Sequence, residues 1–223
     1  MENPRDHCIR CGECCKKSSP TLHIQDLPLI EQSFIKTSSL FTIRKGELVR
    51  DNINDELLSG PHEMIKIRTM NGKRDGCLFY DEVGKACSIY KERPVQCSAL
   101  KCWDTTDFMK IFKSTNLKRK DIIRDGLLLG LIEAHERRCS YLKLEKYVRQ
   151  IESEGEKAVE KIIDALKFDF QLRPFISEKA GIDPVEMDFI FGRPLIRTII
   201  MFGLKVDRQP DGSFFLTAIK KEG

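Results

Sequence analysis

Residues 8–15 read Cys8-Ile-Arg-Cys11-Gly-Glu-Cys14-Cys15, and the fold of the N-terminal part of the chain has to accommodate this stretch. A C-x2-C step lets two thiolates converge on one ion or cluster around a tight turn, and Gly12 relieves that turn. Adjacent side chains of an extended segment point to opposite faces. Cys14 and Cys15 are therefore expected either to serve two metals or to include one thiol that only supports the ligands. Four cysteines in eight residues rarely arise from packing, so the stretch predicts a metal site.

A second group of cysteines follows at spacings of nine, nine and four residues: Cys77, Cys87, Cys97 and Cys102. The first spacing suits a β-hairpin, with a strand over 78–80 and a turn that contains Gly84. Such a hairpin brings Cys77 and Cys87 near each other. Pro94 is placed to open a helical turn that carries Cys97 towards Cys102.

The distribution of the nine cysteines favours a shared site. Eight lie in the first 102 residues, and the last 84 residues contain none. Cysteines that act as small core hydrophobes would be scattered along the chain. Disulfides need an oxidising compartment, whereas the N-terminal residues contain no apolar segment of the kind that a secretion signal requires, and an odd count fits full pairing poorly. We therefore expect a cytoplasmic protein with a metal centre.

These motifs resemble the YkgJ-type cysteine-cluster family (CxxCxxCC), which is described as zinc- or iron-chelating. The resemblance covers residues 8–102 and rests on C-x2-C-x2-C-C, on Gly76-Cys77-Leu-Phe, and on Cys87-Ser-Ile-Tyr-Lys-Glu-Arg-Pro-Val-Gln-Cys97 with Cys102. This chain has Ser98 and Lys101 where members of the family often have Arg and Pro. Flagellin lysine N-methylases carry a similar pattern. The resemblance implies this ligand set: Cys8, Cys11, Cys14, Cys15, Cys77, Cys87, Cys97 and Cys102.

The residues leave the metal open between iron–sulfur and zinc, since both accept four thiolates in a near-tetrahedral array. Eight thiolates suffice for two zinc ions, two four-iron clusters, or one centre with spare thiols. The first three cysteines match the start of the bacterial ferredoxin pattern C-x2-C-x2-C, and the second C-x2-C knuckle of a classical zinc site is missing. We therefore expect one or two iron–sulfur clusters of the 4Fe-4S type, with zinc as the alternative.

Cys139 and the histidines stand apart from the two groups. Cys139 follows an apolar helical run, which favours a buried thiol, although a ninth ligand is the alternative. His7 is the one histidine placed to reach the centre. The others are expected in the core or on the surface: His23, His62 and His135.

Composition excludes several classes of protein. With 32% charged and 41% hydrophobic residues, the 223-residue chain is ordinary globular protein, large enough for one domain or two small ones. The net charge of +4 is too mild to indicate nucleic acid, and no apolar run reaches the roughly 20 residues of a membrane span. Gly-rich phosphate loops, Gly-x-Ser-x-Gly elbows and H-E-x-x-H helices are absent, so hydrolase or kinase chemistry has no support.

The hydrophobic periodicity predicts an α+β fold that is mostly helical. We expect a cysteine-rich module with small hairpins over 1–103 and a helical region with a terminal hairpin over 104–223, sharing one core. A hairpin over 41–50 around Lys45-Gly46 and a strand over 64–70 that pairs near Cys77 belong to the module. Helices are expected from Asp26 and over these ranges: 106–114, 121–136, 142–153, 156–170, 185–191 and 194–201. The terminal hairpin is expected over 204–219.

Three functions fit these features. The favoured one is an iron–sulfur protein that acts in electron transfer or as an accessory subunit of a redox or cofactor-maturation system, with another protein as its partner. The second is a zinc-stabilised protein-interaction module. The third is a protein-lysine methyltransferase, which ranks lowest because no methyl-donor site is recognisable. A non-catalytic role is favoured over an enzyme.

Overall fold

The computed structural model of the chain describes residues 8–51, 56–70 and 76–219. The chain divides into two compact units, the first formed by Met1–Phe41 with Met64–Arg124 and the second by Thr42–Glu63 with Asp125–Gly223. The domain boundary expected between residues 103 and 104 stays a prediction. His7 lies outside the described residues.

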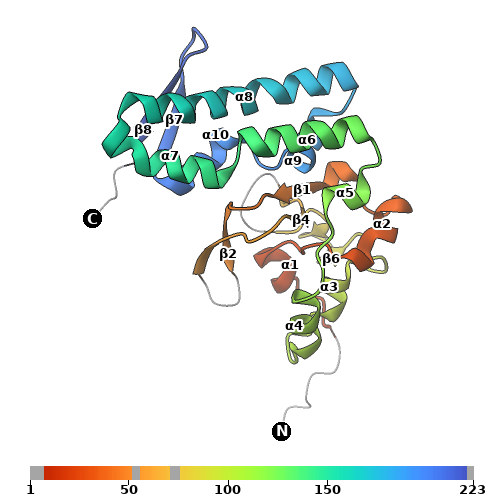
Figure 1. Ribbon diagram of the computed structural model, residues 1–223. Coiled ribbons are helices and arrows are strands. Elements are labelled where there is room, and N and C mark those ends of the chain that lie inside the picture. The colour runs from red at the N-terminus through yellow and green to blue at the C-terminus, as the bar shows by residue number, and fades with distance from the viewer. Residues whose placement is uncertain (1–7, 52–55, 71–75, 220–223) are drawn as a thin grey trace. The chain divides into compact units, whose positions relative to one another are not determined.

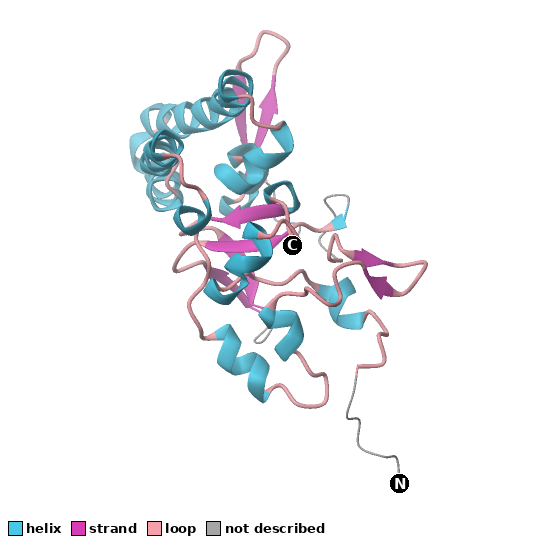
Figure 2. Ribbon diagram, turned by 90° about the vertical axis from the view of Figure 1, so that its right-hand side faces the viewer, coloured by secondary structure: helices cyan, strands magenta, loops and turns pink. Residues whose placement is uncertain are grey.

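The fold is α+β and mostly helical, as the periodicity predicts (Figure 1). Its described strands form four separate two-stranded sheets rather than one continuous sheet (Figure 2). No helix in the described part of the chain is both long and apolar enough to cross a membrane.

The first unit consists of short elements around a small apolar core. Its helices are α1 (Glu13–Lys17), α2 (Leu27–Glu31), α3 (Val95–Ala99), α4 (Thr106–Phe112) and α5 (Arg119–Ile122), with 3-10 turns η1 (Ile24–Asp26) and η2 (Thr37–Ser39). Its strands are β4 (Met64–Ile67), β5 (Tyr80–Asp81) and β6 (Ala86–Cys87). The fully buried apolar side chains are Leu22, Ile35, Leu40, Ile65, Ile67 and Leu117.

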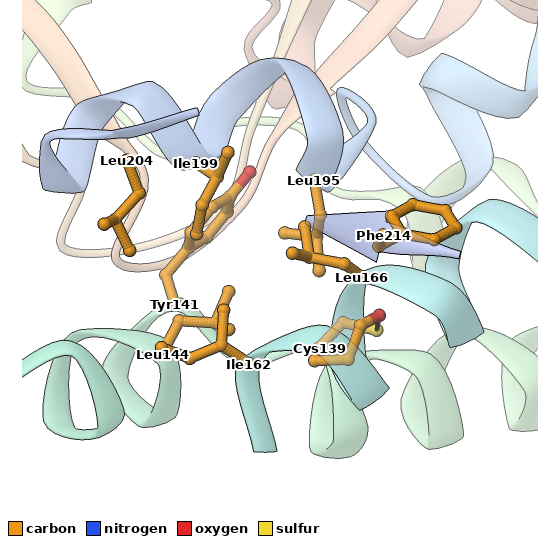
Figure 3. Packing of buried hydrophobic residues seen from close by; sticks show 10 residues of the cluster. Cys139, Tyr141, Leu144, Ile162, Leu166, Leu195, Ile199, Leu204 and Phe214 are labelled. Atoms are coloured by element: carbon orange, nitrogen blue, oxygen red, sulfur yellow. Dashed lines mark hydrogen bonds between the residues drawn. The ribbon is translucent and has the colours of Figure 1, made fainter. Parts of the chain in front are cut away.

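The second unit is dominated by α6 (Gly126–Arg138), α7 (Tyr141–Glu154) and α8 (Glu156–Ala180), and α7 lies beside α8 (Figure 1). The chain then forms η4 (Pro184–Glu186), α9 (Met187–Ile190), α10 (Leu195–Thr198) and η5 (Ile199–Phe202). It ends in the antiparallel hairpin of β7 (Leu204–Arg208) and β8 (Phe214–Ala218), which confirms the expected terminal hairpin. Figure 3 shows side chains from α7 and α8 meeting those from α10 and the hairpin in one apolar cluster.

The hairpin expected over 41–50 is wrong. Strands β1 (Leu40–Ile43) and β2 (Leu48–Asp51) do not pair with each other; β1 pairs with β4, and β2 pairs with β3 (Glu56–Ser59). The connection between them is a turn in which the Arg44 amide donates to the Glu47 carboxylate at 3.0 Å and the Glu47 amide to the Arg44 carbonyl at 3.1 Å. Arg44 is fully buried. Its guanidinium donates to the Cys139 carbonyl at 3.2 Å and lies over the Tyr141 ring, and these contacts compensate for the burial of its charge.

Two helix predictions also need correction. The helix expected over 121–136 is divided into α5 and α6, because the Asp125 carboxylate accepts hydrogen bonds from the amides of Leu127 and Leu128 and starts a new helix. The helix expected to end at residue 170 continues to Ala180, through Pro174, and ends at Gly181 in a left-handed conformation.

Candidate metal centre

The first cysteine motif forms a tight knuckle. Arg10 and Gly12 both have positive φ angles, of 56° and 79°, which turn the chain back twice within five residues. The Arg10 amide donates to the Cys8 sulfur at 3.4 Å. Helix α1 starts directly after Gly12 and carries Cys14 and Cys15. The tight turn agrees with the C-x2-C pattern, whereas Cys14 and Cys15 lie in a helix and not in the extended segment that was expected.

Gly12 is also required by its surroundings. It is buried, and a Cβ atom at this position would lie 1.9 Å from the Tyr80 hydroxyl oxygen. Tyr80 belongs to β5 and pairs with Cys87 of β6. Gly12 therefore lets the first cysteine motif approach the hairpin of the second.

A backbone hydrogen bond joins the two motifs directly. The Cys77 amide donates to the Cys15 carbonyl at 2.7 Å, and Cys77 also forms an antiparallel bridge with Thr69. The hairpin expected between Cys77 and Cys87 is confirmed as β5–β6, with Tyr80 opposite Cys87. The bridge to Thr69 confirms that the segment 64–70 reaches Cys77, although β4 itself pairs with β1.

Helix α3 carries Cys97 and is held by two long-range hydrogen bonds. Pro94 precedes the helix, as expected, and the Val95 amide donates to the Asp26 carboxylate at 2.8 Å. The Gln96 side-chain carbonyl accepts from the Thr21 amide at 2.6 Å. The donors and acceptors of these two bonds are buried or half-buried. The bonds therefore fix the orientation of the helix and hence the direction in which Cys97 points.

Four thiols from both motifs act on one another's pKa values, and Cys87 acts on two of them, Cys77 and Cys97; the group is Cys14, Cys15, Cys77, Cys87 and Cys97. We call these the inner thiols. The sulfurs of Cys14 and Cys15 are 3.9 Å apart. Their hydrogen bond lowers the pKa of Cys14 to about 6 and raises the pKa of Cys15, since one thiolate accepts from the other thiol. Burial raises the pKa values of Cys77 and Cys97, and neighbouring thiols add to both increases.

Two positive side chains act on the inner thiols. The Lys66 ammonium group is buried and donates to the Ser19 carbonyl at 2.6 Å. Desolvation lowers its pKa to about 8, while Cys97 and Cys77 oppose that change. Arg93 contributes to lowering the pKa of Cys14 and counters part of the increase at Cys97. A group of thiolates is easier to form beside such charges.

The remaining predicted ligands are on the surface. Cys8, Cys11 and Cys102 are exposed, as is the inner Cys14, and we call these three, which do not belong to the inner thiols, the outer thiols. All nine cysteines lie within the described residues, and none of them forms a disulfide. Over residues 8–51, 56–70 and 76–219, no three Cys, His, Asp or Glu side chains are arranged to hold a metal ion.

Cys139 and the described histidines have structural surroundings. Cys139 is fully buried in the second unit, where its thiol donates to the Ala165 carbonyl at 3.6 Å and burial raises its pKa to about 12. His23 is buried in the first unit and shares a hydrogen bond of 3.0 Å with the Ser114 hydroxyl. His135 is buried in the second unit and bonds to Asp169 at 2.7 Å.

Sequence reasoning missed the charged and aromatic residues around the thiols. Lys66 falls between Ile65 and Ile67, both buried, and strand alternation places it on the opposite face, but its buried ammonium depends on contacts with residues far away in sequence. Tyr90 and Arg93 lie inside the second motif, and the spacing of the cysteines says nothing about their contacts.

The structure therefore brings the two cysteine-rich sequence motifs together in one module. The comparison with protein families agrees. Residues 7–116 match the CxxCxxCC family model, whose description is "Putative zinc- or iron-chelating domain", in agreement with the resemblance seen in the sequence. No curated protein and no solved structure matches the chain.

Proposed function

We propose that the inner thiols are the core of an iron–sulfur centre and that the protein acts in electron transfer or as an accessory subunit of a redox or cofactor-maturation system. The observation that carries the proposal is the meeting of both cysteine motifs, joined by the hydrogen bond from Cys77 to Cys15. Thiolates at several positions around one point are the donor set that iron–sulfur clusters use. When bound, such a cluster supplies one-electron chemistry.

The surroundings of the thiols fit a thiolate-bound group. Lys66 and Arg93 bring positive charge to a site that becomes strongly negative when the thiols ionise. The Tyr80 hydroxyl is buried beside Gly12 and has no hydrogen-bond partner among the described residues. It is available to donate to a ligand sulfur, and hydrogen bonds to sulfur are one means by which proteins tune the potential of a cluster.

The outer thiols Cys8, Cys11 and Cys102 complete the eight-cysteine ligand set that we propose. Cys8 and Cys11 belong to the same short knuckle that leads into the inner Cys14, and this continuity supports their inclusion. Ferredoxin-type spacing favours iron–sulfur over zinc at these positions. Cytoplasmic residence suits nine cysteines without a disulfide, because a reducing compartment keeps thiols reduced. A second protein is the partner that an electron-transfer or accessory role requires.

The first prediction concerns metal content. Protein purified without oxygen is expected to contain iron and acid-labile sulfide in matched amounts and to absorb in the visible range. Cys97→Ser is expected to lose most of both, because α3 holds this ligand rigidly in place. The control is Cys139→Ala, which removes a buried thiol from the other unit and is expected to retain the metal.

Each outcome of this measurement decides something. Colourless protein with stoichiometric zinc overturns the iron–sulfur proposal and leaves a zinc-stabilised interaction module. Full metal content in Cys97→Ser overturns the assignment of the inner thiols. Protein without any bound metal, purified from cells supplied with iron and zinc, overturns both functions.

A further inference from the structure

An aromatic residue of the second cysteine motif contacts arginines from both motifs. The Tyr90 ring lies beneath the Arg10 guanidinium, with 4.5 Å from the guanidinium carbon to the ring centroid. The Arg93 guanidinium lies over the same ring at 4.3 Å. Arg10 and Tyr90 are 80 positions apart in the chain, so this contact closes a long loop and is not a local feature of either motif.

Every member of this stack is tied to a cysteine. Arg10 sits between Cys8 and Cys11, and its own amide donates to the Cys8 sulfur. The Tyr90 amide donates to the Cys87 carbonyl at 3.2 Å. The Arg93 Nε donates to the Ser98 hydroxyl at 3.2 Å, directly after Cys97. The two ends of the stack are therefore fixed to different cysteine segments.

The knuckle of the first motif needs such an anchor. Arg10 has a positive φ of 56°, a conformation that costs a residue with a side chain about 1–2 kcal/mol. Cys8 and Cys11 are exposed and belong to no regular element, because α1 begins only at Glu13. Contacts that hold this exposed turn in one conformation have to come from outside it, and the Arg10 side chain provides one.

Cation–π contact suits this task. It depends on the face of the ring and not on the phenolic hydroxyl, and it acts on guanidinium groups within about 6 Å of the ring centroid. Two arginines on one tyrosine also place positive charge beside a site that gathers thiolates. Arg93 already acts electrostatically on Cys14 and Cys97.

We propose that the Arg10–Tyr90–Arg93 stack is a positioning device that holds the outer thiols Cys8 and Cys11 against the second cysteine motif and thereby slows the release of bound metal. The inference rests on the proposed metal centre. Tyr90 is a positioning residue here, since it acts through the cysteines and coordinates nothing itself.

The test compares Tyr90→Ala with Tyr90→Phe. Metal-loaded protein is mixed with an excess of a chelator, and the loss of the visible or chelator-complex absorbance gives the rate of release. Tyr90→Ala is expected to release metal about tenfold faster, which corresponds to about 1.4 kcal/mol. Tyr90→Phe keeps the ring face and is expected to stay within about twofold of the unchanged protein.

A matched control comes from the second unit. The Tyr147 ring contacts the Lys161 ammonium group at 5.5 Å, so Tyr147→Ala removes a comparable contact from α7 without touching the cysteine motifs. Its release rate is expected to be unchanged. Release from Tyr90→Ala at the original rate overturns the proposal, and so does equally fast release from Tyr90→Phe, because the ring face is then not what matters.

A second readout needs no metal. The metal-free chain is treated with a short bis-maleimide, and mass spectrometry measures cross-links between the segment with Cys8 and Cys11 and the segment with Cys77 to Cys102. These cross-links are expected to decrease severalfold in Tyr90→Ala and to persist in Tyr90→Phe. Unchanged cross-linking in Tyr90→Ala overturns the positioning role. Absence of metal from the unchanged protein, with cross-links that depend on Tyr90, contradicts the proposed function and leaves the stack as a device that positions thiols.

Discussion

The Asp169 carboxylate accepts hydrogen bonds from three residues of the second unit. One carboxylate oxygen accepts from His135 at 2.7 Å and from Arg173 at 3.0 and 2.9 Å, and the other accepts from the Leu195 amide at 2.8 Å. Burial alone would raise the pKa of Asp169, but the bonds from His135 and Arg173 outweigh it and hold this pKa well below its ordinary value. The carboxylate is therefore ionised and unites α6, α8 and α10.

His135 is the neutral member of this network. Burial lowers its pKa more than the bond to Asp169 raises it, and the charges of Arg44 and Arg173 lower it further. The ring therefore donates Nε2–H to Asp169, and its Nδ1 atom has no partner among the described residues. Such a histidine lowers the free energy of unfolding at pH values at which the unfolded chain binds a proton and the folded chain does not.

The resulting prediction is a loss of stability on mild acidification. Between pH 7 and pH 5 the histidine of the unfolded chain takes up a proton more readily than His135 in the folded protein, whose pKa burial lowers, so the free energy of unfolding falls, by at most about 1.4 kcal/mol per pH unit for this group. Asp169 does not contribute in this range, because its share is lost only below an unfolded pKa of about 3.9. Urea unfolding followed by circular dichroism at three pH values measures the slope.

His135→Gln is the informative variant. Glutamine can still donate to Asp169 and does not titrate, so the dependence on pH is expected to be weaker than in the unchanged protein. Part of the slope remains, because burial also lowers the pKa of His23 in the first unit. Equal slopes in both proteins contradict the assignment of a neutral, buried His135.

At the scale of elements, the sequence predicts turns, helix starts and strands correctly, but it does not predict which strands pair with each other. The turn between Cys77 and Cys87, the helix after Pro94 and the terminal hairpin were predicted correctly, because each depends on turn residues and periodicity within a few positions. The hairpin over 41–50 was wrong, because β1 pairs with the non-consecutive strand β4 and β2 pairs with the strand that follows it, β3. Alternation predicts a strand but does not name its neighbour.

The candidate site shows the same division. The cysteine positions and the hairpin near Cys77 follow from spacing alone, whereas the five inner thiols become a group only through long-range contacts. The bond between Cys77 and Cys15, the buried Lys66 and the stack on Tyr90 join residues tens of positions apart. No local pattern specifies such contacts.

Two glycines of the second unit test whether the buried turn at Arg44 holds its elements together. Gly192 has a φ of +73°, and a Cβ atom there would meet the Arg44 side chain at 2.7 Å. Gly192→Ala is therefore expected to destabilise the protein by about 2 kcal/mol or more, through strain and displacement of Arg44. Gly130 lies inside α6 with nothing within 4 Å of its missing Cβ, and Gly130→Ala is expected to stabilise by about 0.5–1 kcal/mol.

Chemical unfolding of the two variants beside the unchanged protein provides the comparison. Opposite signs are the expected result, since the two substitutions are chemically identical and differ only in backbone conformation and surroundings. A stabilising or neutral Gly192→Ala would mean that Arg44 can leave its place between Tyr141 and Cys139 at no cost.

At the scale of the whole molecule, the thiols and the large helices belong to different compact units. Eight cysteines lie in the first unit, whose elements are short and whose core is small. The second unit has the long helices α6, α7 and α8 and an apolar cluster of its own. A small unit with few buried side chains depends more on metal ligation than a helical unit does, since ligation contributes directly to folding.

Removal of the metal is therefore expected to lower the stability of the first unit selectively. The sole tryptophan, Trp103, follows Cys102 in that unit, so its fluorescence reports on the first unit alone. Far-UV circular dichroism is dominated by the helices of the second unit.

After treatment with a chelator, thermal unfolding followed by Trp103 fluorescence is expected to shift to lower temperature by several degrees, about 4–8 °C for each kcal/mol lost from a domain of this size. The transition followed by circular dichroism is expected to stay in place. Equal shifts of both signals would mean that the two units unfold as one, and an unchanged fluorescence transition would mean that ligation contributes nothing to the unit that carries the cysteines.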